Sequence, residues 1–182
     1  PTVACFIDFK TAFDSVNRVS LWEIMKLDGM PIKLINLIKA HYSNTQACVR
    51  VNNELTGKFP VSTGVRQGCV LSPNLFNYAI DWVMSNALGD YKGVEISTEK
   101  WISDLEYADD IVVFGDSTAS LQPILDRIQE RVRSFDLEIN SSKTKYLLSS
   151  VSDCSSTLRL GSEVLEKVNS FKYLGSEILR SG

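Results

Sequence analysis

The sequence predicts an α+β fold in which an antiparallel sheet carries helices on one face. Two observations lead to this prediction. Short apolar runs alternate with longer segments whose apolar residues recur at helical spacing. Turn residues also join several short runs in pairs, as they do in hairpins. The resulting order is β-α-α-β-β-α-β-β-α-β, which favours one layered α+β domain, or part of one, within the 182 residues.

The first half of the chain predicts a strand, three helices and a hairpin. Proline at a first helical position and the pair Asn52-Asn53 between two strand-like runs support these boundaries. Ser72-Pro73 indicates a helix start, with Ser72 as the cap. The predicted elements are a strand over 3–9, helices over 19–27 and 31–41, hairpin strands over 47–51 and 55–61, a glycine-bracketed loop over 64–71, and a helix whose apolar stripe runs from Leu75 to Leu88.

The second half predicts one long helix among short strands. Ser117 and Thr118 are suited to cap that helix, and its apolar face extends to Phe135. The predicted strands are a hairpin around residues 107–110, then 137–139, 146–148, 158–160, 164–165 and 171–174.

The pair Asp109-Asp110 is the strongest chemical signal. It lies between two apolar stretches, which predicts a hairpin with both acids at its tip. Taken alone, this is also the pattern of an ordinary solvated turn. A second strand-like run, however, ends at Asp8. Carboxylates that converge repel one another unless a cation neutralises them, and their oxygens suit Mg²⁺. The sequence therefore indicates a two-metal site for phosphoryl transfer.

Charge and composition narrow the function classes. The net charge is −3, and residues 61–136 hold 6 basic and 12 acidic side chains, so the acid excess surrounds the Asp109-Asp110 pair. The four cysteines form no C-x-x-C pair and His41 is the only histidine, which argues against a zinc site, a disulfide framework and Ser-His or Cys-His catalysis. No apolar run is long enough to span a membrane, so we expect no membrane association.

The chain resembles the reverse transcriptases of non-LTR retrotransposons. Five sequence motifs of that family occur in the family's order: motif A at 6–16, motif B at 64–73 with Leu75-Phe76, motif C at 107–110, motif D at 137–140 with 143–145, and motif E, the primer grip, at 171–175. The resemblance implies a polymerase palm, covering 1–182 as a partial reverse transcriptase domain without most of the fingers and without the thumb.

The resemblance also implies the metal site. Asp8 and Asp109 would hold two Mg²⁺ ions, for which Mn²⁺ is a possible substitute. Asp110 would complete the catalytic triad, and Phe9 would offer its backbone carbonyl. Lys143 would protonate the leaving pyrophosphate as a general acid. The alternative for Lys143 is an ordinary solvated lysine in a turn.

Other residues would contact the substrates. Phe13 would exclude the ribose 2′-hydroxyl, and its alternative is a core aromatic. Arg66 would contact phosphate, and its alternative is a surface arginine. The remaining implied contacts are the backbone amides of Thr11 and Ala12 with the triphosphate, Gln67 and Gly68 with the nucleotide, and Tyr173, Leu174 and Gly175 with the primer.

The function expected from the resemblance is RNA-directed DNA polymerisation in retrotransposition. Its partners would be an RNA template, a DNA primer or target DNA, and deoxynucleoside triphosphates. We expect residues 1–182 alone to be inactive, and the parent protein to be intracellular, in the nucleus and in a cytoplasmic ribonucleoprotein. Two alternatives remain: a non-catalytic RNA-binding relic or domesticated palm, and a group II intron-type maturase. The oligomeric state is left open.

Overall fold

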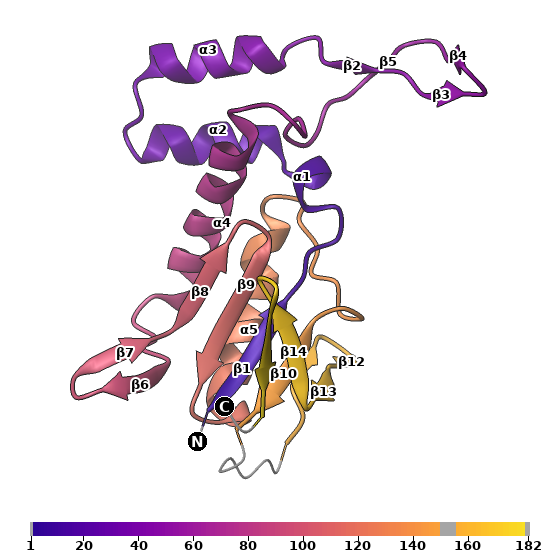
Figure 1. The fold of residues 1–182 in the computed structure, drawn as a ribbon. Helices are drawn as coiled ribbons and strands as arrows, with labels where there is room; N and C mark the ends of the chain where they lie inside the picture. Colours follow the sequence, from indigo (N-terminus) through magenta and orange to yellow (C-terminus); the bar gives the residue numbers. More distant parts are fainter. Residues whose placement is uncertain (1, 150–155, 181–182) are drawn as a thin grey trace.

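A five-stranded sheet forms the centre of the fold (Figure 1). The structure is a computed structural model and describes residues 2–149 and 156–180. The strand order is β13 (Glu166–Val168), β10 (Lys145–Leu148), β1 (Val3–Ile7), β9 (Asp110–Gly115) and β8 (Asp104–Tyr107). The pairs from β10 to β8 are antiparallel, as predicted, whereas β13 joins β10 in parallel.

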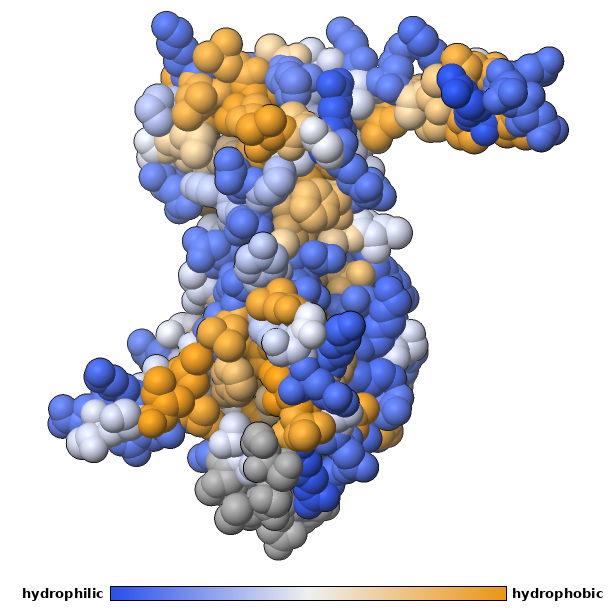
Figure 2. Space-filling view, viewed as in Figure 1, coloured by the Kyte–Doolittle hydropathy of each residue, from blue (hydrophilic) through white to orange (hydrophobic). Residues whose placement is uncertain are grey.

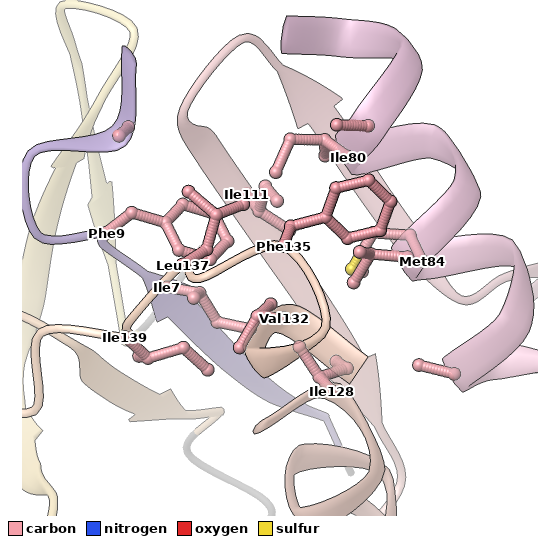
Figure 3. Packing of buried hydrophobic residues seen from close by; sticks show 14 of the residues in the cluster. Ile7, Phe9, Ile80, Met84, Ile111, Ile128, Val132, Phe135, Leu137 and Ile139 are labelled. Atoms are coloured by element: carbon pink, nitrogen blue, oxygen red, sulfur yellow. The ribbon is translucent and has the colours of Figure 1, made fainter. Parts of the chain in front are cut away.

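Two long helices cover one face of the sheet. They are α4 (Ser72–Leu88) and α5 (Thr118–Arg133), which pack against each other. The core between helices and sheet contains Ile7 of β1, Ile111 of β9, Met84 of α4 and Ile128 of α5, together with Phe135 (Figure 3). The predicted antiparallel sheet with helices on one face is thus confirmed, apart from the parallel edge strand.

A hairpin covers part of the opposite face. It consists of β14 (Ser170–Tyr173) and β15 (Ser176–Leu179). Below it lie Ala4, Phe6, Val112 and Leu147, which are all buried. The ring of Phe171 stacks on that of Phe6, with centroids 4.0 Å apart. This contact fixes the hairpin over the end of the central strands.

Three shorter helices lie beyond the sheet. They are α1 (Ala12–Ser15), α2 (Arg18–Leu27) and α3 (Ile32–Tyr42), of which α2 and α3 were predicted and α1 was not. Apolar side chains reach the surface in the α2–α3 region (Figure 2), including Leu27, Ile32 and Leu37. Within the described residues, no helix combines the length and the apolar content needed to cross a bilayer.

Four small two-stranded pairs, which form three hairpins, complete the described fold. The predicted hairpin around Asn52-Asn53 is confirmed, and both asparagines have positive φ, 49° and 66°, as a two-residue hairpin turn requires. Its arms are each interrupted. The strands are β2 (Gln46–Ala47) with β5 (Phe59–Pro60), β3 (Arg50–Val51) with β4 (Glu54–Leu55), β6 (Val94–Ser97) with β7 (Lys100–Ile102), and β11 (Arg159–Leu160) with β12 (Glu163–Val164).

Two local predictions are wrong. Ser72 does not cap α4: Leu71 is the N-cap, and the buried Ser72 hydroxyl lies 3.0 Å from the Tyr42 hydroxyl. Residues 137–139 form no strand, because only Ile139 makes a bridge, with Phe9, before the chain turns. The cap of α5 is confirmed, since the Ser117 hydroxyl accepts a hydrogen bond from the Ser120 amide.

Candidate active site

Asp8 and Asp110 lie side by side at the ends of two paired strands. The β1–β9 register ends with Ile7 opposite Ile111, and its next position places Asp8 opposite Asp110. Side chains alternate along strands, so both carboxylates lie on the face of Phe6 rather than in the helix-covered core. They line a pocket of about 200 Å³, whose other walls are Phe6, Ile7, Ile111, Lys143, Phe171 and Tyr173.

The β8–β9 turn presents Asp109 at its tip. The turn residues are Ala108 and Asp109, and Ala108 has a φ of 55°. Asp110 is the first residue of β9 and pairs with Tyr107. The prediction of both acids in the turn is therefore wrong for Asp110. The two-residue turn contains Ala108 and Asp109, so Asp110 becomes the first residue of β9. Its position in the strand places it next to Asp8.

The three carboxylates influence one another electrostatically. Partial desolvation, and then the negative charges of Asp109 and Asp8, raise the pKa of Asp110. The Tyr173 hydroxyl donates a hydrogen bond of 3.2 Å to the Asp110 carbonyl oxygen. Burial, followed by the charges of Asp110 and Glu106, raises the pKa of Tyr173. The site thus concentrates negative charge that a cation would relieve.

The turn over residues 140–144 holds Asp8 from the other side. The Asn140 amide donates to the Asp8 carbonyl at 2.8 Å. The Asp8 amide in turn donates to the Thr144 hydroxyl at 3.2 Å, and Thr144 is fully buried. Lys143 Nζ lies 3.7 Å from Asp8 Oδ2. One turn therefore fixes the backbone of Asp8 and places a positive charge at its carboxylate.

The donors present fit a hard divalent cation. Asp8 Oδ2 is shielded from solvent and, among the described residues, has no hydrogen-bond partner. A buried carboxylate oxygen without a hydrogen bond, beside a second carboxylate, is the donor chemistry that Mg²⁺ prefers. Within residues 2–149 and 156–180, no group of three or more His, Cys, Asp or Glu side chains is arranged to hold a metal ion. A magnesium site here would therefore need further oxygen donors, such as substrate phosphates and water.

The segment after Asp8 turns sharply into α1. Phe9 is buried in the core, and its backbone pairs with Ile139. Thr11 adopts a left-handed conformation with a φ of 45°, and its carbonyl accepts from the amides of Asp14 and Ser15. Ala12 is buried at the start of α1. Thr11 is thus the N-cap of α1, three residues after Asp8.

Phe13 lies between the core and the surface. Its ring stacks on the fully buried ring of Phe76, with centroids 4.6 Å apart and an interplanar angle of 16°. The side chain is partly exposed. This position combines a core contact with an accessible edge, so neither alternative for Phe13 is eliminated by its packing.

The 64–71 loop packs on α1. The Val65 amide donates a hydrogen bond to the Phe13 carbonyl at 2.7 Å, and the Gly64 amide donates one to the Val16 carbonyl at 2.9 Å. A Cβ on Gly64 would lie 2.5 Å from the Asp14 carbonyl oxygen, so only glycine permits this approach. The Gln67 amide nitrogen lies 3.3 Å from the Asp14 carboxylate.

Arg66 makes a side-chain contact within the fold, whereas Gly68 is in an open position of the same loop. Arg66 donates to the Thr45 hydroxyl at 3.2 Å and lines a separate pocket of about 90 Å³ with Asp14. Gly68 has a φ of 82°, and a Cβ there would meet no atom within 4 Å. Glycine is therefore favoured at position 68 by the positive φ and not by a lack of space for a side chain.

The predicted primer-binding residues occupy the β14–β15 turn. Tyr173 pairs with Ser176, and Leu174 and Gly175 form the turn, with φ of 49° and 85°. Leu174 is 52% exposed. The hairpin therefore presents an apolar tip beside the carboxylates.

Arg18 is a structurally important residue that the sequence analysis missed. Its guanidinium is buried and donates to the carbonyls of Gly64 at 2.7 Å, Thr63 at 2.8 Å and Val61 at 3.0 Å. It also lies 4.8 Å from the ring centroid of Tyr42. Arg18 thereby fixes the start of the 64–71 loop, and its only sequence signal is an arginine at the start of a predicted amphipathic helix.

The predicted site residues thus fall into two groups. Asp8, Asp110, Lys143 and Tyr173 line one pocket, with Asp109 at the adjoining tip. Phe13, Arg66 and Gln67 belong to the second group, around α1 and the 64–71 loop. Only residues 9–11 separate Asp8 from α1, so the chain links the two groups directly.

Solved structures share this fold. The telomerase from Candida tropicalis, truncated from its C-terminal domain, superposes with a TM-score of 0.66 at 17% identity, over 98% of this chain and 34% of that one. The telomerase from Candida albicans, solved with a fragment of telomeric RNA, gives a TM-score of 0.65 at 11% identity, over 98% and 29%. These likenesses establish the palm fold.

Sequence relatives come from mobile elements. The chain is 33% identical over 133 residues to the retrovirus-related Pol polyprotein from type-1 retrotransposable element R2 of Nasonia vitripennis, covering 73% of this chain and 13% of that protein. It is 27% identical over 181 residues to the RNA-directed DNA polymerase from mobile element jockey of Drosophila funebris, covering 98% and 20%. The chain therefore spans a small part of the length of these relatives. Residues 1–178 match the family model of reverse transcriptase (RNA-dependent DNA polymerase), and the chain belongs to that family.

Proposed function

We propose that this chain is the palm of an RNA-directed DNA polymerase of a non-LTR retrotransposon, which adds deoxynucleotides to a DNA 3′ end on an RNA template. The observation that carries the proposal is the placement of Asp8 and Asp110 in one pocket, one position beyond the last β1–β9 pair and beside the turn that bears Asp109. The family match and the mobile-element relatives support the same activity.

Asp8, Asp109 and Asp110 would hold two Mg²⁺ ions, or Mn²⁺ in their place, and the Phe9 carbonyl would add a further oxygen. Bound ions of this kind activate a hydroxyl nucleophile and stabilise charge on a leaving pyrophosphate. The residues around them have positioning roles. The 140–144 turn fixes the backbone of Asp8, and Tyr173 fixes that of Asp110.

The second group of residues would bind the incoming deoxynucleoside triphosphate. Phe13 would select against a ribose 2′-hydroxyl from its position on Phe76. Gln67, Gly68 and Arg66 would contact the nucleotide, and the Thr11 and Ala12 amides would face its phosphates. Lys143 would deliver the proton to the pyrophosphate. Leu174 and Gly175, with Tyr173, would support the primer end.

The template in this proposal is RNA, and the primer is the 3′ end of a target DNA. One of the structural neighbours was solved in complex with a fragment of telomeric RNA. We propose that the parent protein acts in the nucleus, where the target DNA lies, and travels there from a cytoplasmic ribonucleoprotein. A maturase or a non-catalytic relic is an alternative that the following experiment addresses.

The test is primer extension on an RNA template with deoxynucleoside triphosphates and Mg²⁺. The protein is residues 1–182 flanked by the fingers and thumb segments of its own reading frame, which we call the extended protein. We expect extension by the extended protein, none by residues 1–182 alone, and complete loss with Asp110→Asn. Extension that survives Asp110→Asn contradicts the proposal, and absence of extension by the extended protein favours the relic.

A further inference from the structure

The Lys143 ammonium group lies beside the Asp8 carboxylate, which would bind a metal ion in the proposed function. Its nitrogen lies 3.7 Å from Asp8 Oδ2, the oxygen that has no hydrogen-bond partner among the described residues. Lys143 is also the one cationic side chain among the residues that line the carboxylate pocket. The positive charge that Asp8 needs is therefore supplied by the chain itself.

The ion pair between Lys143 and Asp8 is weak and exposed. The Lys143 side chain is 68% exposed, and no contact other than Asp8 is described for its ammonium group. At 3.7 Å the pair is an ion pair without a hydrogen bond, and such exposed pairs contribute little. The backbone contacts of Asn140 and Thr144 hold Asp8 independently of Lys143. Lys143 can thus leave without disturbing the position of Asp8.

A divalent ion and Lys143 compete for the same oxygen. Two cations at one carboxylate oxygen repel each other, and the ion carries the larger charge. An ammonium group displaced from Asp8 remains on the same turn, beside the pocket, where phosphate groups are its natural partners.

We propose that Lys143 is a displaceable counter-ion: it neutralises Asp8 before the divalent ion arrives, and ion binding releases it to contact the triphosphate. This inference rests on the proposed function, because it assumes that Asp8 binds the ion. It predicts opposite effects of Lys143 on the two ligands. Lys143 weakens binding of the free ion and strengthens binding of the nucleotide.

The first experiment measures Mn²⁺ binding to residues 1–182 by electron paramagnetic resonance titration. Lys143→Gln should tighten Mn²⁺ binding about two- to fivefold, the loss of competition expected from an exposed ion pair. Lys10→Gln is the matched control. It removes the same charge two residues from Asp8, but Lys10 pairs with Glu138 at 2.5 Å. The effect of Lys143→Gln must exceed that of Lys10→Gln.

The second experiment measures binding of deoxynucleoside triphosphate in the presence of Mg²⁺ to the extended protein. Lys143→Gln should weaken it, and Lys143→Arg should restore most of it. A purely structural lysine would change both affinities in the same direction or neither, and either result overturns the inference.

The outcomes separate this inference from the proposed function. In one outcome, Asp110→Asn abolishes Mn²⁺ binding, but Lys143→Gln and Lys10→Gln have equal Mn²⁺ affinities. That result overturns the counter-ion role and still supports the metal site. Absence of Mn²⁺ binding to wild-type and variant chains alike overturns the counter-ion role, whereas the proposed function is decided separately by primer extension with the extended protein.

Discussion

The Tyr173 hydroxyl donates a hydrogen bond to the backbone carbonyl of Asp110, over 3.2 Å. This contact joins the β14–β15 hairpin, which carries the predicted primer-binding residues, to the strand that carries the Asp110 carboxylate. Because Phe171 of the same hairpin stacks on Phe6, the two attachments fix the hairpin at both ends of β14. The position of the primer and the position of Asp110 should therefore be coupled.

Tyr173→Phe should lower the rate of primer extension by the extended protein about two- to tenfold, since one hydrogen bond contributes about 0.5–1.5 kcal/mol. The matched control is Tyr91→Phe. The Tyr91 hydroxyl donates to the Phe114 carbonyl at 2.8 Å, near the other end of the same strand. Equal losses of extension rate in both variants would show that the Tyr173 contact serves only the fold.

Thr144→Val should destabilise the chain by about 1–2 kcal/mol, because the Asp8 amide loses the hydroxyl of the buried Thr144 as its acceptor while the side-chain shape is kept. Urea unfolding measures the free energy. Thr144→Ser retains the hydroxyl and should recover most of the hydrogen-bond contribution. A Val variant as stable as the wild type would mean that Asp8 is not held by this contact.

Phe13→Ala should let the extended protein incorporate ribonucleotides, because the ring edge that would meet a 2′-hydroxyl is gone. The measurement is the ratio of deoxynucleotide to ribonucleotide incorporation, which should fall. Phe76→Leu is the control: it disturbs the stacked partner of Phe13 and costs stability without removing that edge. An unchanged ratio in Phe13→Ala would assign Phe13 to packing alone.

The sequence predicted the elements whose signals are local. The apolar stripe of α4, the Ser117 cap of α5 and the Asn52-Asn53 turn each depend on a few neighbouring residues, and all three are present. The convergence of Asp8 with the hairpin followed from placing each acid at a strand end. Where pairing depends on distant residues, prediction failed: nothing in residues 166–168 signals a parallel edge strand.

The contacts that support the site could not be predicted from the sequence either. A buried threonine that accepts from Asp8, or an arginine that binds three loop carbonyls, carries no periodicity and no turn signal. Ser72 shows the same limit, since its hydroxyl bonds with Tyr42 from 30 residues away instead of capping α4. Tertiary partners decided these roles.

Arg18→Met should destabilise the chain by about 3–5 kcal/mol, because three carbonyls lose their buried charged donor. Arg18→Lys should recover little, since an ammonium group cannot reproduce the planar guanidinium contacts. Thermal or urea unfolding tests both. Near-wild-type stability of Arg18→Met would mean that the carbonyls find water instead.

The last prediction concerns Glu106, which lies on β8 near Asp104 and Asp81. Partial desolvation, then hydrogen bonding to Asp104 and the charges of Asp104 and Asp81, raises the pKa of Glu106 from its ordinary value near 4.5 to about 7, although part of the side chain stays exposed. The folded chain therefore holds a proton on Glu106 that the unfolded chain has released between these two pH values. Stability must fall as the pH rises through this window, because folding is linked to proton uptake.

Glu106→Gln keeps a neutral side chain at every pH, so the variant should lose less stability than the wild type between pH 5 and 8. Urea midpoints at several pH values measure the difference. Glu23→Gln, on the exposed side of α2, is the control for removing one acidic group and should retain the wild-type slope. A slope in Glu106→Gln as steep as that of the wild type would assign the pH dependence to the other acids of this region.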